Sequence, residues 1–173
     1  MPGGRKLMFN NNKGSALVMV MMYALILTIL GTSVLAITMN EYRMEKAYRD
    51  SVAAYYLAEA GLEKAIYNIA EMENISTDLS FQIWEMDAGD QDLLKPGSHG
   101  NYTVSVENVQ LDDIIYVDEQ QTVVYKRIYK ISLKSRASME GMTREIEAGI
   151  KVEDYEAGGI ENKVEILYWR QIR

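Results

Sequence analysis

The sequence contains no cysteine, one histidine and only two prolines among its 173 residues. Without cysteine the chain can form neither a disulfide framework nor a metal site built on thiolates. An exported domain of this composition must therefore be held together by packing alone. The single histidine, His99, lies in a Pro-Gly-Ser-His-Gly stretch, and we interpret it as an exposed turn residue.

Positive charge is also scarce, with 18 Lys and Arg against 25 Asp and Glu, a net charge of −7. Because nucleic-acid phosphates are bound by basic surfaces, this balance argues against nucleic acid as a partner. The sequence has no nucleophile motif, no Gly-rich phosphate loop after a strand and no HExxH pair. We therefore expect no enzymatic activity and no cofactor.

Charged side chains are absent from residues 14–40, whereas Arg5, Lys6 and Lys13 precede this stretch. The apolar run over residues 15–39 is long enough to cross a bilayer, since about 20 apolar residues suffice for a helix. Flanking Lys and Arg residues stay in the cytoplasm. The sequence therefore predicts a single-pass protein of the cytoplasmic membrane, with its N-terminus inside and its soluble part outside.

Three interpretations of this segment remain open. A cleaved secretory signal would use Val-Leu-Ala at residues 34–36, but its apolar core is usually only about 7–15 residues long. An uncleaved anchor would belong to an extracytoplasmic binding or envelope protein unrelated to fibres. In the third interpretation, cleavage occurs before the apolar run, at Gly14 and Ser15, and the run survives as the mature N-terminus.

This junction, a short basic leader that ends in Gly14, resembles the class III signal of type IV pilins and type II secretion pseudopilins. The resemblance implies that residues 1–14 are a leader, which a prepilin peptidase removes before it methylates Ser15. It implies three partners: other pilin or pseudopilin subunits, bound through the N-terminal helix, the prepilin peptidase and the membrane. After assembly the chain would lie in a cell-surface pilus or a pseudopilus.

Met19 is the fifth residue after this junction, and it departs from the pattern of major pilins. Major pilins usually carry Glu there, which pairs with the terminal amine of a neighbouring subunit. The first acidic residue of this chain is Glu41. Relatives that lack the carboxylate are similar to the K-type pseudopilin at the fibre tip, so the resemblance implies a minor subunit at the tip or in initiation.

A second motif, LAEAGLEKA at residues 57–65, is similar to the N-terminal region of PilX-type pilus assembly proteins and K-type pseudopilins. Its central residues are Glu59, Ala60 and Gly61, and the resemblance covers residues 5–70. The function it implies is that of a minor pilin or pseudopilin-like structural subunit, in a type IV pilus or a type II secretion-like fibre.

Residues 15–73 predict one long helix, because no proline occurs between Pro2 and Pro96. From Met44 to Ile69 apolar residues recur every three or four positions, which predicts that the second half of the helix packs on a sheet. Gly31 is our candidate for a point where the helix bends or unwinds in a packed fibre.

Residues 74–100 are predicted to be a connecting region, in which residues 78–86 form a short helix or pack as a loop. Beyond them, residues 101–173 predict a head made of a small antiparallel sheet. The expected strands are 102–109, 122–138, 142–153 and 164–169, with 111–117 as a further strand added to the first. The fold class is therefore α+β, a helix packed on a sheet, and the pilin resemblance implies the same lollipop form.

Glu140 and Gly141 form a two-residue hairpin signal between two of these strands. The register that follows places Arg136 opposite Glu145 and Lys134 opposite Glu147, and opposite charges across strands favour pairing. A shift of one residue would move the basic side chains into the core. The same register sets Lys130 opposite Lys151, a like-charge pair that the sequence does not explain.

Three sets of side chains are weaker site candidates. Asp87, Asp90 and Asp92 form a D-x-x-D-x-D loop that could bind calcium, since some pseudopilins do so, although a solvated acidic loop has the same composition. A second acidic set is Asp112, Asp113, Asp118 and Glu119. Tyr125, Tyr129, Tyr155, Tyr168 and Trp169 would form a binding face or, alternatively, pack in the core.

Overall fold

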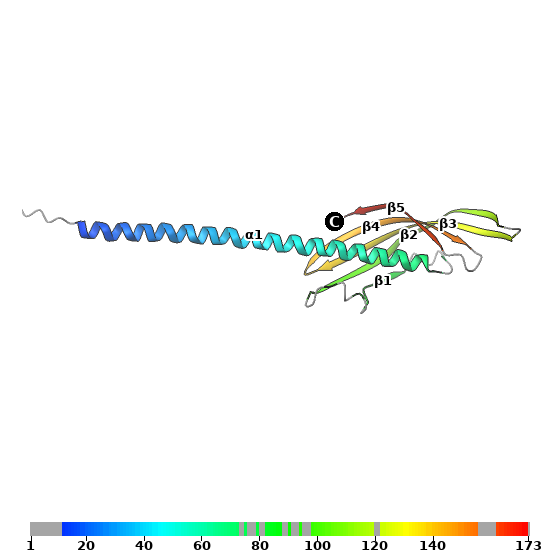
Figure 1. The fold of residues 1–173 in the computed structure, drawn as a ribbon, viewed down its shortest axis with the longest axis horizontal. Helices are drawn as coiled ribbons and strands as arrows, with labels where there is room; N and C mark the ends of the chain where they lie inside the picture. Colours follow the sequence, from blue (N-terminus) through cyan, green and yellow to red (C-terminus); the bar gives the residue numbers. More distant parts are fainter. Residues whose placement is uncertain are drawn as a thin grey trace, which may run out of the picture. The chain divides into compact units, whose positions relative to one another are not determined.

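The structure, a computed structural model, describes residues 12–72, 75, 79, 82–87, 90, 94, 98–119, 122–155 and 162–172. The chain divides into two compact units, residues 1–46 and residues 47–173. The described elements are α1 (Asn12–Ala70), β1 (Ile83–Glu85), β2 (Gly100–Glu119), β3 (Thr122–Met139), β4 (Met142–Tyr155) and β5 (Lys163–Gln171) (Figure 1).

The long helix α1 runs without interruption for 59 residues, from Asn12 to Ala70. The absence of proline explains this continuity, because every residue keeps the N–H that a helical hydrogen bond requires. Neither Gly31 nor Gly61 interrupts the helix. The structure confirms the predicted long helix, which ends at Ala70; the predicted end at residue 73 lies outside the described residues.

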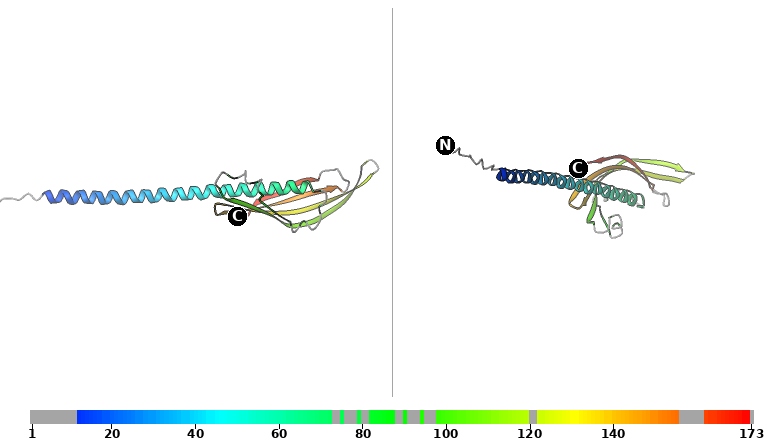
Figure 2. Two further views of the ribbon diagram at one scale, coloured as in Figure 1. Left: turned by 90° about the horizontal axis from the view of Figure 1, so that it is seen from below. Right: turned by 60° about the vertical axis from the view of Figure 1, so that its left-hand side comes forward.

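The five strands form one antiparallel sheet in the order β1-β2-β3-β4-β5. Neighbours in the sheet are therefore neighbours in the chain, as in a meander of successive hairpins. Within residues 47–173, the last part of α1 lies along one face of this sheet (Figure 2). A long helix followed by an antiparallel sheet that contacts it confirms the predicted α+β class.

The pairing of β3 with β4 has the predicted register. Tyr129 lies opposite Val152, Arg136 opposite Glu145 and Lys134 opposite Glu147. The turn residues Glu140 and Gly141 have φ angles of 49° and 85°, both left-handed, as the twist of a two-residue hairpin requires.

The like-charge pair Lys130 and Lys151 is explained by side chains from neighbouring strands. Lys130 forms an ion pair with Asp112 of β2 at 2.8 Å, and Lys151 lies 3.3 Å from Glu153 within β4. Asp112 is at a β-bulge, where the pairing of β2 with β3 shifts between Leu111 and Asp113. The extra residue therefore supplies the carboxylate that neutralises Lys130.

Two predictions about strands need correction. Residues 102–109 and 111–117 belong to one 20-residue strand, β2, whose pairing is shifted at two places, after Val106 and after Leu111.

Residues 83–85 form strand β1, and not a short helix or loop. A three-residue edge strand is too short to show periodicity, which is why the sequence did not reveal it. Trp84 packs against the core, whereas Ile83 is exposed.

The core lies between the sheet and the part of α1 that follows residue 53. The helix contributes small and branched side chains that are fully or almost fully buried: Ala54, Leu57, Ala58, Leu62, Ala65 and Ile69. The sheet contributes alternate residues of its central strands, among them Tyr102, Val104, Ile131, Leu133, Ile146, Ala148, Ile150 and Val152. The predicted helical stripe is therefore confirmed only in its second half, because Met44 and Tyr48 are exposed.

Strand β5 at the edge of the sheet is covered unevenly. Val164 and Trp169 pack against the core, whereas Ile166 and Leu167 are exposed. On the opposite face the ring of Tyr168 lies over Gly149, where a Cβ atom would collide with it. The strand is therefore partly covered on each face.

Candidate functional site

The candidate processing junction, Gly14 and Ser15, lies in the first turns of α1, which begins at Asn12. Both residues are exposed, and a Cβ atom added to Gly14 would meet no atom within 4 Å. The first turn of a helix lacks partners for its N–H groups and opens easily. A protease could therefore reach this peptide bond without unfolding any packed element. Residues 1–11 of the predicted leader lie outside the described part.

The apolar surface of residues 17–39 is not covered by any residue that the structure describes. Every described side chain from Leu17 to Met39 is exposed, and the most apolar 18-residue window of the helix has a mean hydropathy of 2.3. By length and composition this helix could cross a membrane. The hydroxyls of Thr28, Ser33 and Thr38 donate to carbonyls four residues earlier at 2.8–3.0 Å, so they bring no unsatisfied donor into an apolar environment.

Met19 and Gly31, the predicted fibre-packing residues, both lie on this uncovered helix. Met19 is 59% exposed, and no described residue lies within 4 Å of a Cβ atom placed on Gly31. The structure thus leaves both positions accessible to a partner. Their roles in packing stay predictions.

The motif Glu59, Ala60 and Gly61 lies where α1 packs on the sheet. A Cβ atom on Gly61 would lie 2.6 Å from Cδ2 of Tyr102, so the ring of Tyr102 occupies the space that a side chain would need. Glu59 and Ala60 are half-buried beside it. In this chain the motif is therefore the contact that brings the helix close to β2.

Lys64 links this motif to the acidic candidates Asp87 and Asp90. Its ammonium group lies 2.9 Å from Asp87 and 2.8 Å from Asp90, and the Tyr102 hydroxyl donates to Asp90 at 2.5 Å. Sequence reasoning missed this lysine, because the loop that it binds begins 23 residues further along the chain. We call Lys64, Asp87, Asp90 and Tyr102 the lysine clasp.

The clasp sets the charge state of its members. Hydrogen bonds to Asp90 and Asp87 raise the pKa of Lys64. Burial raises the pKa of Asp90, but hydrogen bonds from Lys64 and Tyr102 outweigh it and hold that pKa below its usual value. Burial, together with the hydrogen bond to Asp90, raises the pKa of Tyr102 to about 12. At neutral pH the clasp thus consists of one ammonium, two carboxylates and a neutral phenol.

The calcium hypothesis for Asp87, Asp90 and Asp92 must take account of this ammonium group. Lys64 contacts both described carboxylates, so a bound cation would have to displace it. In the part of the chain that the structure describes, no three His, Cys, Asp or Glu residues are grouped as metal ligands would be. Asp92 is not among the described residues, and calcium binding stays an untested prediction.

The second acidic set is not assembled into one site by the described side chains. Asp112 pairs with Lys130, and a carboxylate oxygen of Asp113 accepts the backbone N–H of Ile114 at 2.8 Å. Asp118 and Glu119 lie in β2, but their side chains are outside the described part.

The five aromatic candidates do not form one face, because some are buried and others are exposed. Tyr129 is buried and Trp169 packs against the core, whereas Tyr125 and Tyr168 are exposed. Tyr155 is half-buried, with Lys126 5.7 Å from its ring centre. Core packing, one of the two interpretations of this set, therefore describes Tyr129 and Trp169.

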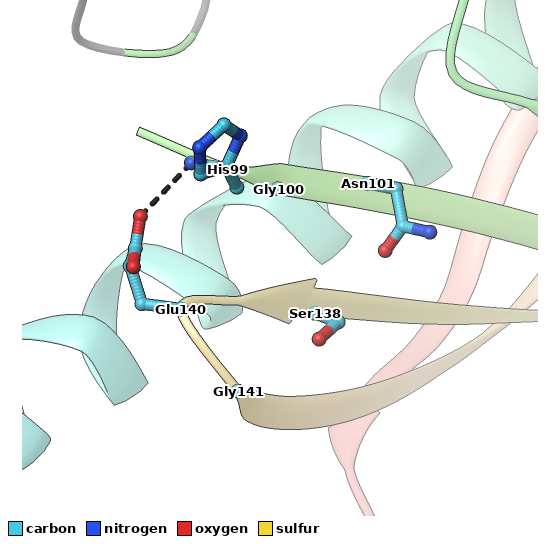
Figure 3. A pocket seen from close by; sticks show the side chains of 6 residues that line it. All are labelled: His99, Gly100, Asn101, Ser138, Glu140 and Gly141. Atoms are coloured by element: carbon cyan, nitrogen blue, oxygen red, sulfur yellow. Dashed lines mark hydrogen bonds between the residues drawn. The ribbon is translucent and has the colours of Figure 1, made fainter. Parts of the chain in front are cut away.

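His99 is exposed, as predicted, at an open hollow of about 510 Å³ (Figure 3). Its backbone N–H donates to the Glu140 carboxylate at 2.9 Å, and its carbonyl accepts the N–H of Glu140 at 3.1 Å. The hollow is lined by His99, Gly100, Asn101, Ser138, Glu140 and Gly141. These bonds tie the start of β2 to the β3–β4 turn.

Comparison with known proteins agrees with the position of these features. Residues 13–63 match a family model described as PilX N-terminal. The matched segment starts beside the Gly14 junction and ends in the Gly61 motif, before the first strand. No curated protein sequence and no solved structure matches the chain.

Over this segment, which is less than a third of the chain, the sequence is similar to a type IV pilin-like minor pilin family. The match supports a type IV pilus-related pilin subunit that interacts with other pilus subunits. An N-terminal apolar helix and similarity to a pilin family fit membrane anchoring and association with a pilus. A family of this kind is structural, which agrees with the lack of catalytic motifs in the sequence.

Proposed function

We propose that this chain is a minor structural subunit of a type IV pilus or a type II secretion-like fibre, cut between Gly14 and Ser15 and methylated at Ser15. The observation that carries this proposal is the difference in burial between the two parts of α1. Residues 17–39 expose apolar side chains without cover, whereas residues after 53 are packed into a separate core. The first part needs an apolar partner outside the chain: lipid before assembly, and the helices of other subunits afterwards.

The orientation we propose places residues 1–14 in the cytoplasm and the head, residues 101–173, outside. Arg5, Lys6 and Lys13 precede the membrane-spanning residues 15–39, and such basic flanks remain inside. In this arrangement the long helix and the connecting residues 74–100 carry the head on the outer side of the membrane.

We further propose that the subunit acts at the fibre tip or in initiation, because Met19 replaces the usual carboxylate. A terminal amine that enters an apolar fibre core must be neutralised, since an isolated charge there is costly. Met19 cannot do this for a neighbour, and α1 has no acidic residue before Glu41. A subunit at one end of the fibre avoids this requirement.

Mass spectrometry of the protein N-terminus, in cells with and without prepilin peptidase, tests the processing step. We expect a methylated Ser15 terminus only when the peptidase is present. Gly14→Val should block cleavage, and Gly4→Val in the leader serves as the matched control that is still cut. An intact Met1 in the presence of the peptidase would favour the uncleaved envelope protein, and a cut after Ala36 would favour a secretory signal.

Immunogold labelling of sheared fibres tests the tip position. Wild-type chain should label one end, and Met19→Glu should add label along the shaft. Met21→Glu places the same carboxylate elsewhere in the apolar run and should not. If wild type and Met19→Glu are equally excluded from fibres, the argument from Met19 has no basis.

A further inference from the structure

A pocket of about 400 Å³ lies inside the unit formed by residues 47–173, where α1 passes one end of the sheet. It is lined by Tyr48, Ser51, Val52, Tyr55, Tyr56, Arg144 and Gln171. Arg144 is on β4, opposite Ala137 of β3, and its guanidinium donates a hydrogen bond to the hydroxyl of Ser51. The helix and the sheet therefore hold a cation at the end of their shared core.

Arg144 differs from the cations on the opposite face of the sheet. Six of those cations each have a carboxylate within 4 Å: Lys126, Lys130, Lys134, Arg136, Lys151 and Arg170. No carboxylate of a described residue pairs with Arg144, whose bond to Ser51 engages a neutral hydroxyl. A guanidinium has five N–H donors, so most of its hydrogen-bonding capacity remains for a ligand.

Tyrosine rings form the walls around this cation. Tyr48 and Tyr56 are 71% and 63% exposed, and Tyr55 packs edge-on against Tyr56 with ring centres 5.6 Å apart. Tyr and Arg are the residue types most enriched at the energetic centres of protein interfaces. Apolar walls also strengthen an ion pair made between them, because they exclude water.

We infer that this pocket binds an acidic side chain of another pilus subunit, a Glu or Asp that has an apolar neighbour to lie on the tyrosine rings. Arg144 pairs with the carboxylate, and a planar guanidinium can do so with two parallel bonds. Charge complementarity selects the carboxylate, and the rings select its apolar neighbour. The inference rests on the proposed function for the identity of the partner, and the helical wall, residues 48–56, lies within the family-matched segment.

The test uses the full chain in cells that assemble the fibre, with the photo-crosslinking residue p-benzoylphenylalanine in place of Tyr48. Irradiation should link the chain to a different pilus subunit.

Arg144→Glu should lower the yield of this crosslink about tenfold or more, since losing one such charged contact changes affinity by about that factor. Arg144→Lys should retain most of the yield. Arg144→Gln, which keeps an N–H for Ser51, should lose several-fold, and this separates charge from folding. Lys163→Glu, at an exposed β5 cation outside the pocket, is the matched control.

Rescue of Arg144→Glu by a carboxylate-to-lysine change at the linked position of the partner would establish the pair. The inference is overturned by an undiminished yield in both Arg144→Glu and Arg144→Gln, or by no crosslink from wild type. It is equally overturned by a crosslink to a second copy of this chain or to lipid. In these outcomes a chain that is still cut at Gly14 and found in fibres keeps its proposed function. Absence of the chain from fibres refutes both.

Discussion

Single residues decide how closely the helix approaches the sheet. Gly61 can be recognised in the sequence as part of a family motif, but its physical role depends on Tyr102, which lies 41 positions further on (102 − 61). The sequence could not reveal this contact, because the two residues meet only through the tertiary packing of α1 on β2. The same holds for Lys64, whose partners are in a loop that composition alone describes as solvated.

Substitution Gly61→Ala should destabilise the head. The new Cβ atom would lie 2.6 Å from a ring that is only 2% exposed and whose hydroxyl is held by Asp90. Overpacking of this kind costs about 1–3 kcal/mol, more than the roughly 1 kcal/mol that alanine gains over glycine in a helix. Thermal unfolding of the detergent-solubilised chain measures the loss.

Gly31→Ala is the matched control for this measurement, because its Cβ atom meets nothing within 4 Å. A melting temperature that is equal or higher in Gly61→Ala would show that Tyr102 moves aside without cost, contrary to our prediction.

The lysine clasp should make stability depend on pH in the acid range. The pKa of Asp90 in the folded chain lies below its ordinary value of 3.8, so folding is favoured by the ionised carboxylate. This contribution is complete above pH 3.8 and is lost as the pH falls through the lower, folded-state pKa. Lys64→Met should cost about 1 kcal/mol at neutral pH and reduce this acid dependence.

Urea titrations at pH 7 and pH 3 compare the two proteins, with Lys46→Met, at an exposed helix position, as the control. Equal acid sensitivity in wild type and Lys64→Met would contradict the role that we assign to the clasp.

At the scale of elements, the alternation of apolar residues and the turn residues predicted how two strands pair. The β3–β4 hairpin could be derived with its register, because both faces carry matched side chains and Glu140-Gly141 defines the turn. The bulges of β2 could not be derived, since an inserted residue leaves the local pattern of the strand almost unchanged. They resolve the puzzle of Lys130, whose partner Asp112 is itself a bulge residue.

A double-mutant cycle tests this explanation of the Lys130–Lys151 pair. Asp112→Asn should destabilise the head by about 0.5 kcal/mol, within the range of exposed ion pairs, because Lys130 then faces Lys151 without a carboxylate of its own. In a Lys130→Gln background the same change should be close to neutral. Chemical denaturation of the four proteins gives the coupling energy, and a value of zero would mean that Asp112 does not offset the repulsion.

At the scale of the whole molecule, the two units place different demands on their surroundings. Hydropathy alone revealed the apolar helix and its need for lipid or protein partners, because the hydropathy of a continuous segment can be read directly from the sequence. The pocket around Arg144 was not foreseen, because its walls come from α1, β4 and the end of β5. Sites assembled from distant segments are the part of function that a single sequence conceals.

Removal of residues 1–39 should give a water-soluble protein with an unchanged unfolding midpoint. The deleted residues whose side chains the structure describes, 14–39, are all exposed, and the buried core begins at Ala54. A unit with its own core is expected to fold alone. Sedimentation and thermal unfolding check this, with the detergent-solubilised full chain as reference; a lower midpoint in the truncated protein would show that the apolar segment supports the head.

The two bulges of β2 have a consequence for the export that we propose for this head, which has no cysteine and so no disulfides. Beyond the short contact with β1 over residues 103–105, no described strand pairs with the outer edge of β2. A straight edge of that length would recruit strands from other newly exported chains and seed aggregates. Each bulge breaks the hydrogen-bond spacing and bends the strand. In the assembly that we propose, the bulges thus keep this edge of β2 from pairing with other chains before the apolar helix and the Arg144 pocket make their subunit contacts.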